Sequence, residues 1–225
     1  QSIATVLGVE QKLNESGLFL RVEGYEKDLS SLIVSNPNST PGMGYLNSGT
    51  GTARGVEFFL RQPPTERFFG WIAYSLSDSQ RQDAPGAPTY PFEYDEPNVF
   101  TAVGSYKWNP NWDMGFKVLY STGHPYTPVT TGLATPVTVN GQPETIYQAQ
   151  YAPIDSARLP DYFRVDFSTS FKKVYDTWEW KIYVDVVNLL HTQNVLGYQY
   201  NSNYTQATKE LDLPFLPYIG FEVTY

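Results

Sequence analysis

The end of the chain alternates strictly between apolar and polar residues, and this pattern limits the folds available to it. Within residues 213–225, Ile219, Phe221, Val223 and Tyr225 fall on one face, while Gly220, Glu222 and Thr224 fall on the other. A period of two is the signature of a β-strand with one apolar face. An apolar strand with an unpaired edge promotes aggregation, whereas a closed barrel has no free edge. The pattern therefore predicts a barrel strand, with an ordinary edge strand of a soluble sheet as the alternative.

The composition favours a barrel in lipid. Aromatic residues make up 16% of the 225 residues, with 18 Tyr and 13 Phe, yet hydrophobic residues reach only 41%. No run approaches the roughly 20 apolar residues of a membrane-spanning helix. A transmembrane barrel combines these features, because only alternate residues face lipid and aromatic residues gather at the two interfaces.

Charge and cysteine content exclude several classes of function. The formal net charge of −8 argues against nucleic acid as a partner. The chain has no Cys, which removes disulfides and thiolate metal sites, and we expect neither a metal nor a cofactor. Gln1-Ser2-Ile3-Ala4 lacks the basic and hydrophobic regions of a signal peptide. If the protein is exported, we expect this sequence to be a mature form or a piece of a longer one.

Alternation and turn residues predict about nine antiparallel strands. They cover residues 2–14, 18–27, 51–62, 68–79, 98–108, 112–120, 162–173, 178–188 and the final stretch. Short turns at 15–17, 63–67, 109–111 and 174–177 alternate with long loops at about 29–48, 80–97, 124–160 and 191–212. Outer-membrane barrels sort their connections in this way, with short periplasmic turns and long extracellular loops.

Most of the predicted strands have one apolar face and one face with charged residues. The charged residues expected to face the lumen are Arg164, Asp166, Glu179, Lys181 and Asp185, where cross-strand charge pairing against a plug or water is the preferred interpretation over a substrate path. A soluble barrel would turn the same residues outward, so periodicity alone does not decide. Aromatic residues beside the short turns favour the membrane, because they would share one interface level: Phe68, Phe69, Trp108, Trp112, Trp178 and Trp180.

The strand count is odd, whereas single-chain bacterial barrels normally have an even number. With a periplasmic C-terminus, the first strand would start at the outer surface. We therefore expect the C-terminal portion of a larger barrel. The alternative is a missed strand, most plausibly within 124–160, for example at 137–140 with 145–148.

Several segments, in order, resemble the C-terminal barrel of TonB-dependent outer-membrane receptors. They are GTARGVEF (51–58), GWIAYSLS (70–77), STGHPYTP (121–128), LPDYFRVDF (159–167) and VDVVNLLHTQN (184–194). His191 departs from the pattern, because the family often has Asn or Asp there. Gly220, Val223 and Tyr225 also resemble the barrel-assembly signal of outer-membrane proteins.

The resemblance implies a location and a set of partners. The family has a 22-stranded barrel with an N-terminal plug in the outer membrane of Gram-negative bacteria. Residues 1–225 would form the C-terminal part of that barrel, without the plug. The partners implied are outer-membrane lipid, the rest of the barrel with its plug, TonB (through a part absent here) and the barrel-assembly machinery.

The residues that carry function are expected in the long loops, not in a catalytic centre. Ligand candidates are Phe92, Tyr94, His124, Tyr126 and Tyr147. The acidic run 93–96 is interpreted as a solvated loop in preference to a cation site. No catalytic residue is predicted. A small barrel hydrolase using His124 with Asp95 or Glu96 is the weakest alternative.

By resemblance, the function is TonB-dependent uptake of a scarce nutrient, such as a siderophore-, cobalamin- or glycan-like ligand. The other alternative is a receptor-like barrel that acts as a scaffold for other envelope proteins, without transport.

Overall fold

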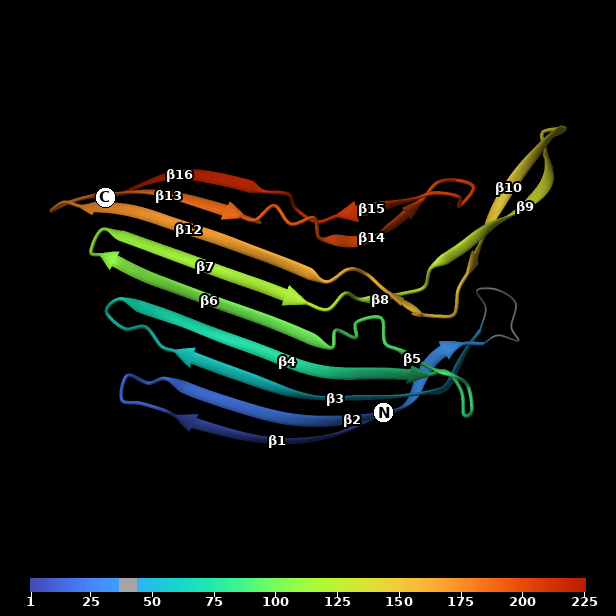
Figure 1. Ribbon diagram of the computed structural model, residues 1–225, viewed down its shortest axis with the longest axis horizontal. Helices are drawn as coiled ribbons and strands as arrows, with labels where there is room; N and C mark the ends of the chain where they lie inside the picture. The colour runs from blue at the N-terminus through green and yellow to red at the C-terminus, as the bar shows by residue number, and fades with distance from the viewer. Residues whose placement is uncertain (37–43) are drawn as a thin grey trace.

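The computed structural model describes residues 1–36 and 44–225, and its centre is one curved antiparallel sheet (Figure 1). Nine strands follow one another along the sheet, as the sequence predicts. They are β1 (Ser2–Lys12), β2 (Phe19–Ser35), β3 (Tyr45–Gln62), β4 (Phe68–Gln82), β6 (Asn98–Asn109), β7 (Trp112–Ser121), β12 (Tyr162–Val174), β13 (Glu179–Val187) and β16 (Leu216–Thr224). β1 and β16 are the two end strands of this path.

All four short turns lie at one end of the sheet, on the left in Figure 1. Gly17 closes the first turn with a φ of 88°, a left-handed conformation that suits glycine. The other connections lie at the opposite end. The predicted sorting of short and long connections is therefore confirmed.

The predicted long loops contain strands that the sequence analysis missed. β5 (Thr89–Pro91) pairs with β4, and β8 (Pro125–Tyr126) pairs with β11 (Ala157–Arg158). Two hairpins stand apart from the main sheet: β9 (Val129–Val139) with β10 (Gln142–Tyr151), and β14 (Val195–Tyr200) with β15 (Ala207–Leu211). The prediction of long loops at 124–160 and 191–212 was therefore wrong, because each range contains a β-hairpin. The suspected extra strands exist, but as a hairpin that adds nothing to the count of nine.

The predicted loop 29–48 was also too long. β2 continues to Ser35 and β3 begins at Tyr45, while residues 37–43 of the predicted loop lie outside the described residues. The alternation is hard to recognise because the register shifts between Leu29 and Leu32, where Ser31 has a φ of 55°. Such a bulge moves the following side chains to the other face.

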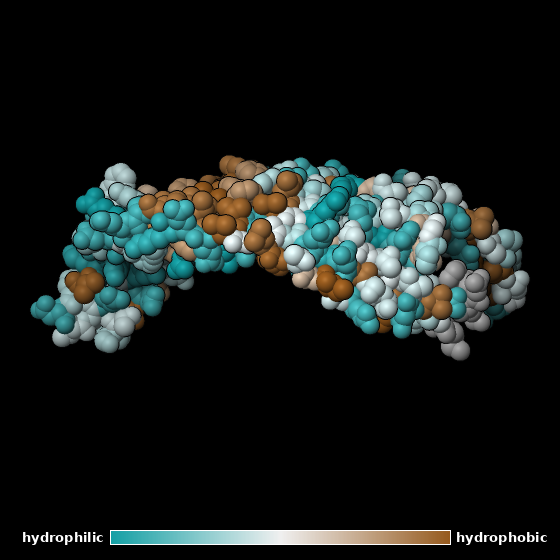
Figure 2. Space-filling view, turned by 90° about the horizontal axis from the view of Figure 1, so that it is seen from below, coloured by the Kyte–Doolittle hydropathy of each residue, from teal (hydrophilic) through white to brown (hydrophobic). Residues whose placement is uncertain are grey.

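One face of the sheet is apolar and exposed, so the sheet has little internal core. Among the described residues, the buried hydrophobic side chains are Leu159, Val186 and Val195. In contrast, Ile219 is 77% and Phe221 66% exposed. In Figure 2, hydrophobic residues gather along the upper, convex edge of the arched molecule in its left half. An exposed apolar surface this extensive is typical of a face that contacts a membrane or another protein.

Aromatic rings form a chain across four strands near the short turns. Trp112 contacts Phe171, Phe171 contacts Trp180, and Trp180 contacts Phe221, with ring centroids 5.6, 5.6 and 6.2 Å apart. Such a row is typical of the interfacial girdle of a barrel. Phe69 lies beside Phe68 in β4, and since successive residues alternate, it faces the polar side. In the described part of the chain, no helix is long and apolar enough to cross a membrane.

Candidate ligand-binding site

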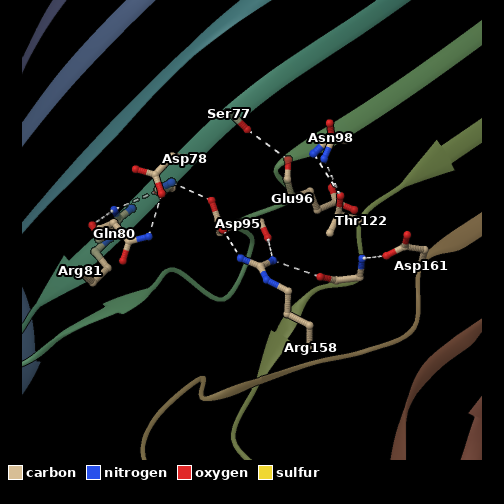
Figure 3. A network of polar contacts seen from close by, with 12 residues as sticks. Ser77, Asp78, Gln80, Arg81, Asp95, Glu96, Asn98, Thr122, Arg158 and Asp161 are labelled. Carbon is tan, nitrogen blue, oxygen red and sulfur yellow. Dashed lines mark hydrogen bonds and ion pairs between the residues drawn. The ribbon is translucent and has the colours of Figure 1, made fainter.

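Arg158 in β11 ties together two of the long connections, the one between β4 and β6 and the one between β7 and β12 (Figure 3). Its guanidinium donates to the Asp95 carboxylate, to the Asp95 carbonyl oxygen at 2.6 Å and to the Gly123 carbonyl oxygen at 3.2 Å. Asp95 also accepts from the Ser79 backbone N–H at 2.7 Å and is 2% exposed. Asp95 is therefore a buried anchor, and the expectation of a solvated acidic loop was wrong at this residue, whereas Glu93 is exposed.

The STGHPYTP segment is held against residues 157–160. β8 pairs with β11, and the Leu159 N–H donates to the His124 carbonyl oxygen at 2.9 Å. A Cβ at Gly123 would meet the Leu159 carbonyl oxygen at 1.8 Å, so only glycine permits this approach. This close packing fixes His124 and Tyr126 relative to the sheet.

Beside this packing lies a cavity of about 600 Å³ with a wall of tyrosines. Its volume falls within the usual range for ligand pockets. The side chains come from the β5–β6 connection, the β8 segment, the end of β10 and the β14–β15 hairpin. The lining includes Tyr94, His124, Tyr126, Tyr151, Tyr198, Tyr200 and Tyr204, together with Glu93, Thr127, Val129, Leu159 and Leu196.

The aromatic rings of the cavity contact one another in pairs. Tyr126 and Tyr198 have centroids 5.4 Å apart, and Tyr94 meets His124 edge-on at 6.1 Å. Burial raises the pKa of the Tyr126 phenol above its ordinary value, and Tyr198 adds to the shift. The Tyr126 hydroxyl therefore stays protonated at neutral pH and can donate as well as accept a hydrogen bond.

Three of the five predicted ligand residues line this cavity: Tyr94, His124 and Tyr126. Phe92 lies next to it, 5.5 Å from Tyr94, and lines a neighbouring cavity of about 390 Å³. Tyr147 sits within β10 and lines neither cavity.

The sequence analysis missed the tyrosines that the two hairpins bring to the cavity. These are Tyr151, Tyr198, Tyr200 and Tyr204. The segment YQYNSNY (198–204) carries three of them and was the available signal.

The five charged residues predicted to face the lumen share one face of the sheet by strand register. Their ion pairs differ from the predicted cross-strand pattern. Arg164 pairs along its own strand with Asp166 at 3.1 Å and reaches Asp212 at 3.6 Å. Lys181 lies opposite both Lys172 and Glu222, and among the described residues it has no ion pair within 4.0 Å, nor do Glu179 and Asp185.

The three residues of the predicted assembly signal lie in or beside β16. Gly220 pairs with Tyr183, and Val223 pairs with Trp180. Tyr225 follows the strand and is 97% exposed.

The fold defines the class of protein: the chain is a wall segment of a transmembrane β-barrel. More specifically, it belongs to the family described as TonB dependent receptor-like, beta-barrel, whose profile matches residues 3–189. A search of curated proteins found no match.

Solved structures share the fold at low sequence identity. The chain is similar to the ferric-catecholate import receptor Fiu from E. coli K12, with 14% identity and a TM-score of 0.66, covering 99% of this chain and 27% of that one. It is also similar to the ferripyoverdine receptor of the outer membrane of Pseudomonas aeruginosa bound to ferripyoverdine, with 12% identity, a TM-score of 0.60 and coverage of 99% and 26%. A complex of FpvAI with pyocin S2 matches at 13% identity and a TM-score of 0.60, with 99% and 27% covered. The chain thus spans about a quarter of these proteins.

Proposed function

We propose that the protein takes up a scarce nutrient through the outer membrane of a Gram-negative bacterium in a TonB-dependent manner, and that the tyrosine cavity captures the ligand. The cavity carries this proposal, because it lies at the end of the sheet with the long connections and is built on packed, hydrogen-bonded segments. Family membership supports the receptor role. The ligand class proposed is siderophore-, cobalamin- or glycan-like.

We further propose that residues 1–225 act as part of a larger barrel. The two end strands, β1 and β16, support this, since each has a partner on one side only within the described sheet. The partners proposed are the remaining barrel strands, a plug, outer-membrane lipid on the apolar face, TonB and the barrel-assembly machinery.

Two other functions lead to different expectations. A scaffold would hold envelope proteins without transport, and its role would not depend on TonB. A hydrolase would use His124, whose Nε2 lies 3.6 Å from a Glu96 oxygen. Asp95, the other candidate acid, is already engaged by Arg158. We propose instead that His124 serves the cavity, because it lines the wall beside Tyr94.

Uptake of labelled nutrient mixtures into cells with and without TonB tests the proposal. The complete receptor and a Tyr126→Leu, Tyr198→Leu variant would be compared at equal outer-membrane abundance. We expect uptake of one solute to require TonB and to fall at least tenfold in the variant. If neither the loss of TonB nor the variant changes the uptake of any solute, the transport proposal is contradicted and the scaffold is favoured. Hydrolysis that is lost in His124→Ala with folding intact would favour the enzyme.

A further inference from the structure

The charge around the tyrosine cavity is negative. Among the residues that line it in the described structure, Glu93 is acidic and none is Arg or Lys. Two further carboxylates contact lining residues: a Glu96 oxygen lies 3.6 Å from the His124 Nε2 atom, and the Asp155 carboxylate accepts from the Thr127 hydroxyl at 3.4 Å. The nearby Arg158 is neutralised by the buried Asp95.

Aromatic faces attract cations because each ring carries negative charge density above its plane. A contact between a cation and an aromatic ring occurs in the same part of the molecule. The Arg81 guanidinium carbon lies 4.0 Å from the Phe92 centroid, and Phe92 contacts Tyr94 at the cavity. Lys209 pairs in register with Tyr198 but does not line the cavity. Several tyrosines with an acidic neighbour form the arrangement that recognises organic ammonium groups.

We infer that the tyrosine cavity binds a ligand through a positively charged organic group of the ammonium type, and discriminates against anionic ligands. This inference rests on the proposed function for its biological setting, but the cation preference belongs to the cavity itself. Glu93 supplies the opposite charge, and Tyr126 with Tyr198 supplies the ring faces.

Three probes of one shape and different charge test this inference on the complete receptor in detergent micelles. The cationic probe is choline. The neutral probe is its isostere with carbon in place of the quaternary nitrogen, and the anionic probe is a carboxylate with the carbon skeleton of that isostere. Ligand-observed NMR titration gives each dissociation constant. We expect choline to saturate with a dissociation constant at least tenfold below that of the neutral isostere, and the carboxylate not to saturate. Equal binding of choline and its isostere, or no saturable choline binding to folded receptor, would overturn the inference.

Matched variants connect the preference to the cavity. Glu93→Gln should reduce the choline preference at least threefold, and Tyr198→Leu should weaken choline more than Tyr198→Phe, which keeps the ring. Lys209→Gln should strengthen choline binding, because it removes a competing positive charge. A choline preference unchanged in Glu93→Gln and Tyr198→Leu would place binding elsewhere and overturn the inference. These binding measurements do not depend on TonB. If no solute is taken up in a TonB-dependent manner, the transport proposal fails, whereas the cation preference is still decided by the binding measurements.

Discussion

The ring of Tyr183 covers Gly220 on the neighbouring strand. The two residues are register partners of β13 and β16, and a Cβ at Gly220 would lie 2.0 Å from the Tyr183 Cζ atom. The absence of a side chain at Gly220 therefore makes room for the tyrosine. An aromatic side chain that covers a strand glycine in this way helps to fix the register of the pair.

Substitution of Gly220 should destabilise the end of the sheet. We expect Gly220→Ala to lower the free energy of unfolding by about 2 kcal/mol, because the tyrosine must leave its position. Gel-shift assays of heat-modifiability and urea titration of the complete receptor would measure this change. Tyr183→Ala in the same chain should restore most of the loss. Gly104→Ala is the matched control, since its Cβ would meet only a Phe68 ring atom at 3.9 Å.

The ion pair between Asp95 and Arg158 should contribute more to stability than exposed ion pairs do. Arg158→Met leaves a buried carboxylate without its cation, which typically costs about 3 kcal/mol. We expect the connections around the cavity to open while the sheet stays folded, and limited proteolysis with mass spectrometry would locate the cleavage. Arg54→Met is the control, because Arg54 and Asp78 are 69% and 41% exposed, and such pairs contribute about 1 kcal/mol or less. Equal proteolysis of both variants would contradict this ranking.

Asn188 should be needed for the connection between β13 and β16. Its side chain is fully buried and donates to the Thr192 and Leu213 carbonyl oxygens, both at 2.9 Å. Asn188→Gly keeps the left-handed backbone (φ 53°) but removes these bonds, and we expect a loss of about 2 kcal/mol. The Thr192 N–H donates to the Asn188 Oδ1 atom at 3.0 Å, so faster hydrogen exchange at this amide would report the loss. Asn201→Gly, in an exposed turn, should change global stability far less.

The strands of the main sheet were predictable because one face of each is apolar. In β12 the alternation from Phe163 to Phe171 is uninterrupted, and the predicted strand matches Tyr162–Val174 closely. The β9–β10 hairpin was not predictable in the same way. Both of its faces are largely exposed, so Thr occurs on either side, and no period of two in hydropathy marks its whole length.

The cavity was only partly predictable for a related reason. Tyr94, His124 and Tyr126 come from segments whose Pro- and Tyr-rich composition predicts a loop. Tyr198, in contrast, reaches them only because the β14–β15 hairpin folds back beside β8. Tyr147 has the same residue type but sits in the middle of β10, away from the cavity. Residue type thus indicated that aromatic side chains form the site, while long-range packing determined which of them line the cavity.

His191, the departure from the family pattern, should accept the residues that the family often has there. Its φ is 53°, in the left-handed region that Asn and His adopt more readily than β-branched residues. We expect His191→Asn to leave the urea midpoint of the complete receptor unchanged or slightly raised, although the Phe215 N–H loses its 3.4 Å bond to Nδ1. His191→Val should lower the free energy of unfolding by about 1 kcal/mol or more, because two methyl groups on its Cβ crowd the backbone in the left-handed region, which β-branched residues rarely adopt. If Val is tolerated as well as Asn, then backbone conformation is not what restricts this position.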